Sequence, residues 1–308
     1  MIRRVSAPEF VQMFPHPAHI YNSVAFAEHN RAKCDGKDLR YLFISDSKVR
    51  FGVILGRRDD ALCSPFSAPF GGLVSNRTQQ FDLVDDAWRQ LLQYAEAEGC
   101  RLHVTLPPAI YDSATTARSV YSLTKLGLTP SVDVSYHIDL DANDIVTMMA
   151  ASSRNHLKRA NAGGLVFEKL RPVHADIARV YRIIEANHQS RNHRMAMSLA
   201  DVESTAALVC ADIFIVSLEG NDIAAAIVYP SADGVIQLIN WGDMPGFSHL
   251  RPMNFFAAKL YEYYKAEGRK ILDLGPASSS QGVTDFGLAA FKESLGAVPT
   301  LKFTFRQP

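Results

Sequence analysis

Two charged residues near the C-terminus stand in otherwise apolar surroundings, where they could transfer a proton or donate hydrogen bonds. Asp273 interrupts an apolar segment with the composition of a buried strand. A carboxylate there is either desolvated, with a raised pKa suited to proton transfer, or satisfied by a partner such as Arg269 or a backbone donor. Lys292 lies on a predicted helix whose apolar positions, among them Leu288 and Leu295, face the core. It is either a buried charged donor or an ordinary solvated lysine on an amphipathic helix.

Basic residues of the second half have a spacing that could bind an anion. Arg154 and Lys158 are four apart on one face of a predicted helix, so they could hold a phosphate or a carboxylate. Arg251 precedes Pro252, a residue suited to a first helical turn, and could meet an anion at that helix N-terminus. The plainer interpretation of Arg154 and Lys158 is a solvated helix face.

A polar stretch containing His188, Arg191 and His193 follows an amphipathic helix. It forms either part of a binding site or a plain surface loop. The two histidines are five apart, which is a poor match for one helix face and therefore for a pair of metal ligands. The motifs GxGxxG, GxxxxGK, HExxH and GxSxG are absent from the sequence. We therefore expect a site without a metal ion.

The elements that must position these residues occur twice. A segment of the first half aligns without a gap with the segment that carries Asp273 and Lys292. The matches include Ala97, Glu98 and Gly99 with Ala266, Glu267 and Gly268, and Pro107 with Pro276. A repeat of about half the chain indicates a duplicated domain, because solenoid periods are only about 20–50 residues. Val104 is the counterpart of Asp273 and Leu123 that of Lys292, so only the second copy carries charge at these positions.

Composition agrees with two globular domains. The chain has 308 residues, enough for two cores of about 150 residues each. We expect domains over residues 1–141 and 142–308. Lys plus Arg and Asp plus Glu both number 32, and this balance argues against a DNA-binding protein. No segment approaches the ~20 apolar residues of a membrane span, and the four cysteines form no CxxC, so we expect reduced thiols and a cytoplasmic protein.

Both halves are predicted to have one order of elements: helices, antiparallel strands, a helix, a strand, a helix and a closing strand. The closing strands are VDVSYHIDL in the first half and TLKFTFR in the second. The predicted fold class is α/β, of the α+β type with mixed sheets. Each domain would hold a mostly antiparallel sheet flanked by helices.

This order resembles the GNAT acyltransferase fold, and the tandem pair is similar to the Fem (FemABX) peptidyltransferases. Those enzymes add amino acids from aminoacyl-tRNA to the peptide stem of peptidoglycan precursors. The likeness rests on Asp273-Leu274-Gly275 with the FK-containing ending Phe291–Gly296, and on the basic helix Arg154–Ala160. The family's last FG is Leu295-Gly296 here. The Q/R-x-x-G-x-G/A pyrophosphate loop of acetyl-CoA enzymes is missing before Pro252.

The resemblance implies transfer of an acyl or aminoacyl group to an amine through a tetrahedral oxyanion, which needs hydrogen-bond donors and a proton acceptor. Lys292 would donate to the oxyanion, and Asp273 would take part in proton transfer. In this fold the third strand splays from its neighbour and exposes a backbone N–H, here within Asn240–Gly242. The further residues implied in substrate binding are Trp241, Arg154, Lys158, His188, Arg191, His193 and Arg251.

We expect the active cleft in or beside the second domain, with the first domain a degenerate copy that helps to hold the acceptor. The resemblance implies no permanently bound cofactor. The donor would be aminoacyl-tRNA or acyl-CoA, and the acceptor a small molecule or a muropeptide. Two alternatives are an acyl-CoA-dependent N-acyltransferase of a sugar or amino acid in surface polysaccharide metabolism, and a non-catalytic binding protein on a duplicated GNAT fold.

Overall fold

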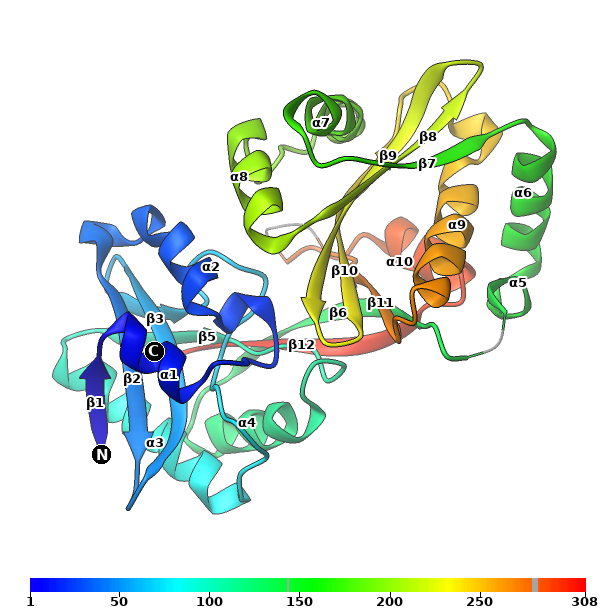
Figure 1. Ribbon diagram of the computed structural model, residues 1–308. Coiled ribbons are helices and arrows are strands. Elements are labelled where there is room, and N and C mark those ends of the chain that lie inside the picture. The colour runs from blue at the N-terminus through cyan, green and yellow to red at the C-terminus, as the bar shows by residue number, and fades with distance from the viewer. Residues whose placement is uncertain (143, 279–281) are drawn as a thin grey trace. The chain divides into compact units, whose positions relative to one another are not determined.

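A computed structural model describes residues 1–142, 144–278 and 282–308 (Figure 1). The chain divides into two compact units, one of Met1–Val134 with Thr300–Pro308 and one of Ser135–Pro299. Each unit contains a mixed, largely antiparallel sheet with helices on its faces, which confirms the predicted fold class. Among the described helices, none is both long enough and apolar enough to cross a membrane.

The sheet of the first unit has the strand order β1-β2-β3-β4-β5-β12. Strands β4 and β5 are parallel, and the other neighbours are antiparallel. The strands are β1 (Ile2–Val5), β2 (Leu39–Ser45), β3 (Val49–Arg58), β4 (Ala61–Ser64), β5 (Arg101–Thr105) and β12 (Val298–Arg306). The helices are α1 (Ala7–Met13), α2 (Val24–His29), α3 (Phe81–Ala97) and α4 (Ser113–Lys125).

Alternation along β2 gives the first unit a core on each face of its sheet, because successive strand residues point to opposite faces. Leu42 and Ile44 pack with Trp88 and the other buried residues of α3. Tyr41 and Phe43 point the other way and pack with Phe10 of α1 and with Ala27 of α2. Both faces are therefore covered, and the burial of Leu39–Ile44 on both faces of β2 follows from this.

The sheet of the second unit has the order β6-β11-β10-β9-β8-β7, with β10 and β11 parallel. The strands are β6 (Pro130–Asp139), β7 (Val166–Leu170), β8 (Asp212–Leu218), β9 (Asn221–Ala232), β10 (Val235–Asp243) and β11 (Ile271–Pro276). The helices are α5 (Ile145–Met148), α6 (Ala151–Ala162), α7 (His174–Ser190), α8 (Leu199–Val209), α9 (Pro252–Ala266) and α10 (Phe286–Ser294).

Helices cover both faces of this second sheet (Figure 1). On one face Phe214 and Val216 of β8 pack with the buried residues of α9, against which α6 also lies. On the other face α7 and α8 cover β9, next to Ile213 and Ile215. The end of α7 thereby comes to lie beside the end of β10.

The two closing strands do not complete the sheets of their own halves. Strand β6 pairs with β11 over Ser135–Asp139, and β12 pairs with β5 over Thr304–Arg306. Core packing explains the exchange, because Phe305 is buried in the core of the first unit and Ile138 in that of the second. The compact units therefore differ from the contiguous halves 1–141 and 142–308.

Candidate active site in the second unit

The end of β11 is a bulge that is held by Asp273 and Lys292. The register with β6 shifts between Asp273 and Gly275, and Gly275 has a φ of 70°. The Gly275 N–H donates to Oδ1 of Asp273 at 2.8 Å. Nζ of Lys292 donates to the carbonyl oxygens of Leu274, Gly275 and Pro276 at 2.8, 3.0 and 2.8 Å. Both predicted catalytic side chains therefore converge on one piece of main chain.

Lys292 is buried and uses all its donors in these contacts. The residue is 2% exposed, and an ammonium group has three N–H bonds. Burial lowers the pKa of Lys292 to about 8, against the opposing attraction of Asp273 and Asp285. With its three protons on backbone carbonyls, the ammonium group has none left for a substrate oxyanion. This geometry favours a positioning role for Lys292, and its direct action as an oxyanion donor stays a prediction.

Asp273 lies in a polar row that crosses three strands. It is register partner of Gln237 on β10 and of His137 on β6, and Asp273 and Gln237 are both buried. Nδ1 of His137 is buried without a hydrogen-bond partner among the described residues. Burial lowers the pKa of His137, although Asp273 raises it. Sequence reasoning missed His137, because the residue reaches the second unit only through the exchange of closing strands.

Strands β10 and β11 part where the resemblance predicted a splay. They are register partners only at Val235–Gln237 and Ile271–Asp273. Beyond these three pairs β10 continues along β9, where Asn240, Trp241 and Gly242 have partners. The Trp241 ring lies 5.8 Å from the ring of Phe291, which precedes Lys292 on α10. The predicted segment Asn240–Gly242 therefore lies on the parted stretch.

The end of α7 is fastened to the end of β10. Nδ2 of Asn187 donates to the main-chain oxygen of Asp243 at 2.8 Å and to its Oδ1 at 3.0 Å. A Cβ atom on Gly242 would lie 2.6 Å from Cγ of Asn187, so only glycine admits the asparagine here. Burial raises the pKa of Asp243, while Arg191 and Asn187 act to lower it.

Of the three residues predicted from the polar stretch, Arg191 lies near this carboxylate, and His188 lies near both Arg191 and His193. Nη2 of Arg191 is 4.0 Å from Oδ1 of Asp243, and the rings of His188 and His193 are 6.3 Å apart. Nδ1 of His188 is buried without a partner among the described residues. Burial, His193 and Arg191 all lower the pKa of His188. The neutral imidazole and the guanidinium group therefore lie at one end of α7.

Sequence reasoning missed Asp243. Its carboxylate ends a strand and is followed by a loop, a position typical of a solvated turn residue. The only signal was the preceding glycine, Gly242, because a glycine inside a strand often marks a close approach of another element. Which element approaches could not be read from the sequence.

The basic residues lie on α6 and just before α9, and they take no part in the hydrogen bonds that hold the β11 bulge. Arg154 and Lys158 are exposed on α6, and Nη1 of Arg154 donates to the Met149 carbonyl at 2.5 Å. Arg251 is exposed and precedes α9 with a φ of 58°. Burial lowers the pKa of His156 on α6, and the charges of Arg251 and Arg159 lower it further. No hydrogen bond or ion pair among the described residues joins Arg154, Lys158 or Arg251 to Lys292.

Hydroxyl and amide groups tie α6 to the helices on either side of it. Oγ of Ser153 lies 2.8 Å from Oγ of Ser294 on α10 and accepts from Nδ2 of Asn254 on α9 at 3.1 Å. Ser153 and Asn254 are buried. The basic helix and the helix of Lys292 are therefore parts of one packed layer.

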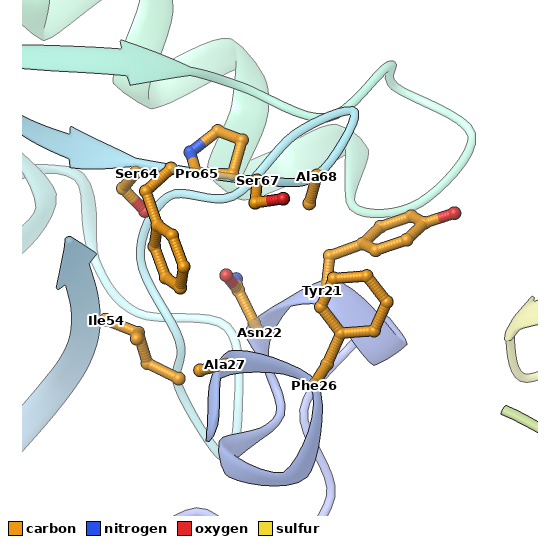
Figure 2. Close-up of a pocket in the computed structure, with 10 residues that line it drawn as sticks. Tyr21, Asn22, Phe26, Ala27, Ile54, Ser64, Pro65, Ser67 and Ala68 are labelled. Carbon is orange, nitrogen blue, oxygen red and sulfur yellow. The ribbon is translucent and has the colours of Figure 1, made fainter. Parts of the chain in front are cut away.

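Two small cavities lie in the first unit. One has about 260 Å³ of empty space, part of it open to solvent, between the rings of Tyr21 and Phe26 and the segment Ser64–Ala68. Figure 2 shows the amide of Asn22 pointing into this space. The other has about 300 Å³ of empty space, also partly open to solvent, and is lined by His19 and by the first turns of α4. None of the predicted site residues lines either cavity.

Comparison with known proteins finds likeness in structure alone. No protein-family model matches the chain, and no curated protein matches it in sequence. FemX is similar over 99% of this chain and 96% of its own, with a TM-score of 0.70 and 12% identity. L-PGS from Bacillus licheniformis is similar over 97% and 90%, with a TM-score of 0.61 and 14% identity. A tandem GNAT protein from the clavulanic acid biosynthesis pathway is similar over 100% and 99%, with a TM-score of 0.56 and 10% identity. The chain therefore has a tandem GNAT fold like that of FemX, which confirms the predicted resemblance.

Proposed function

We propose that the second unit is an acyltransferase that moves an acyl or aminoacyl group from an ester or thioester donor to an amine. The observation that carries this proposal is the parting of β10 from β11 after Gln237 and Asp273. Main-chain groups of β10 on the parted side have no register partner in β11 beyond these residues. The β9 ladder holds β10 in place on its other edge, so N–H groups on the parted edge would be preorganised donors for a carbonyl oxygen that becomes negative.

The hydrogen bonds that hold the end of β11 support the same reaction. Asp273 and Lys292 fix the main chain of Leu274–Pro276 by four hydrogen bonds. A bulge leaves carbonyl groups unpaired unless other donors bind them. Because Lys292 supplies these donors, the end of β11 is held rigid, and the space between β10 and β11 keeps a constant width. We propose that Lys292 and Asp273 serve catalysis by holding this edge.

The basic groups near α6 support a donor with an anionic carrier. Arg154, Lys158 and Arg251 are exposed and could contact phosphate groups. The preferred donor is aminoacyl-tRNA, in line with the Fem-like layout. Acetyl-CoA is the second candidate donor, because the resemblance to GNAT enzymes also implies an acyl-CoA donor. The acceptor would be the amine of a cell-wall precursor, in a cytoplasmic setting.

Binding assays with both donors test the proposal. Alanyl-tRNA or acetyl-CoA should raise the melting temperature of the protein by mass action, and labelled acyl groups should pass to UDP-linked muropeptides. If tRNA is the carrier, Arg154→Ala with Lys158→Ala should reduce the slope of log affinity against log salt by about 2. Lys37→Ala with Lys48→Ala, in the first unit, removes the same charge and should leave the slope unchanged.

The outcomes separate the candidates. A shift with acetyl-CoA alone, unaffected by the α6 variants, would replace tRNA by coenzyme A as carrier. Binding of a muropeptide without transfer from either donor would contradict acyl transfer and favour a binding protein. Absence of any effect with all three probes would also overturn the proposal.

A further inference from the structure

We propose that Asp243 is the general base of this site and that the acceptor is a primary amine, whose proton passes to Oδ2 of Asp243. The inference rests on the proposed acyl transfer and deepens it. Asp243 follows Asn240–Gly242, the segment of β10 that is parted from β11. The carboxylate therefore lies one residue beyond the main chain proposed to hold the donor carbonyl.

The contacts of Asp243 leave one oxygen for substrate. Among residues 1–142, 144–278 and 282–308, the side-chain contacts of its carboxylate come from Asn187 at 3.0 Å and Arg191 at 4.0 Å, and both are to Oδ1. The side chain is 10% exposed. The carboxylate also interacts with the Asp243 main-chain N–H. Since both side-chain contacts are to Oδ1, Oδ2 is the oxygen that we assign to the incoming amine.

The site is built by close packing rather than by a flexible loop. Asn187 is buried and holds both the main-chain oxygen and the side chain of Asp243. Gly242 makes room for this amide, since any Cβ there would overlap it. The register partner of Asp243 in β9 is Ala224, whose apolar side chain offers the carboxylate no hydrogen bond. Such an arrangement fixes the carboxylate within the tolerance that proton transfer needs.

The charges that face Asp243 come from the end of α7 and the turn after it. Arg191 is the nearest, while His188 and His193 lie close to Arg191. Burial raises the pKa of Asp243 and outweighs the opposing effects of its own backbone hydrogen bond, of Arg191 and of Asn187. A raised pKa makes the carboxylate a stronger base and brings it nearer to the pH at which proton transfer is efficient.

The reaction balances without any further reactant. The amine nitrogen attacks the donor carbonyl carbon, a C–N bond forms, and the carbonyl oxygen becomes an oxyanion. The proton on nitrogen moves to Oδ2 of Asp243. The oxyanion then reforms the carbonyl as the C–O or C–S bond to the carrier breaks, and the leaving oxygen or sulfur takes the proton from Asp243. The products are an amide and the free carrier.

Three variants test the inference in the full chain. Asp243→Asn keeps the shape and the contact with Asn187 but cannot accept the proton, so transfer to the amine should fall by about 10²–10⁴-fold. The melting-temperature shift with donor should stay as in the wild type. Asp243→Ala should be equally slow and should recover part of its rate when formate is added, because formate can replace the missing base. Asp233→Asn, in the exposed turn before β10, removes the same charge and should retain full activity.

A pH profile adds a readout that a structural role would not affect. Transfer by the wild type should decline at acid pH as Asp243 is protonated, and Asp243→Asn should lack this decline. If the wild type transfers acyl groups while Asp243→Asn retains its rate, or formate restores nothing to Asp243→Ala, the inference is wrong and the proposed function stands. If the wild type transfers no acyl group from either donor, both fall.

Discussion

Substitution of Lys292 by methionine tests the claim that this residue holds the end of β11. Methionine keeps a long unbranched side chain and removes the ammonium group. The carbonyl oxygens of Leu274, Gly275 and Pro276 would then lose the donor that serves them at 2.8–3.0 Å. We expect a folded but less stable protein.

The magnitude is a balance of two effects. A buried acceptor that loses its donor costs about 1–3 kcal/mol, which gives at most about 9 kcal/mol for three. Against this, the wild type buries a charge. Its pKa of about 8 instead of 10.5 corresponds to about 3 kcal/mol of disfavoured ionisation at neutral pH. Partial hydration of the carbonyls reduces the loss further, so we expect Lys292→Met to lower the free energy of unfolding by about 2–5 kcal/mol.

The difference should also depend on pH. Because the folded pKa of Lys292 lies below the unfolded one, the unfolded chain binds more protons between pH 8 and pH 10.5. The free energy of unfolding of the wild type therefore rises with pH in this window, by about 2 kcal/mol from pH 7.5 to pH 9.5. Lys292→Met lacks the group and should not show this gain, so the gap between the two proteins should widen.

Urea unfolding at pH 7.5 and pH 9.5 measures both quantities, with Lys270→Met as the control. Lys270 is exposed, and its loss should change stability by no more than about 0.5 kcal/mol. A Lys292→Met protein as stable as the control, or a gap that stays constant with pH, would refute the buried contact between Nζ and the β11 carbonyls.

Three further substitutions probe other parts of the structure. Phe305→Ala should cost about 3–5 kcal/mol, and hydrogen exchange should show the loss in amides of the first unit although Phe305 belongs to the second half of the sequence. Gly242→Ala should cost about 1–3 kcal/mol by overlap with Asn187, and Asn187→Gly in the same chain should relieve part of it, as a double-mutant cycle by thermal melting would show. Asp273→Ala should cost about 1–3 kcal/mol by freeing the Gly275 N–H; Asp273→Asn, whose carbonyl still accepts, should cost less than Asp273→Ala in the same melts.

The repeat made the fold class predictable, because hydrophobic periodicity and turn residues recur in both halves. The pairing of the closing strands was not predictable from the same pattern. VDVSYHIDL and TLKFTFR have similar alternation and occupy equivalent positions, so either could cover either sheet edge. The choice depends on non-local contacts, such as those of Phe305 with the first unit.

The sequence revealed candidate site residues where a charge interrupts an apolar pattern. It did not reveal residues that are buried by a helix or strand distant in the sequence. Asp273 and Lys292 belong to the first kind. The sequence could not show that Lys292 uses its three protons on the main chain, because this depends on the bulge at Gly275. Asp243 and His137 belong to the second kind, since α7 and the exchanged strand bring them into the site.

The exchange of closing strands also means that neither half of the chain is self-sufficient. A fragment cut at its midpoint would carry β6 without β11, or β12 without β5. The outer edge of β5 or β11 would then be open to any strand that reaches it. Each fragment must either fold its own last strand back into that place or borrow one from another molecule, so two separated halves are natural partners for reconstitution when they are produced together.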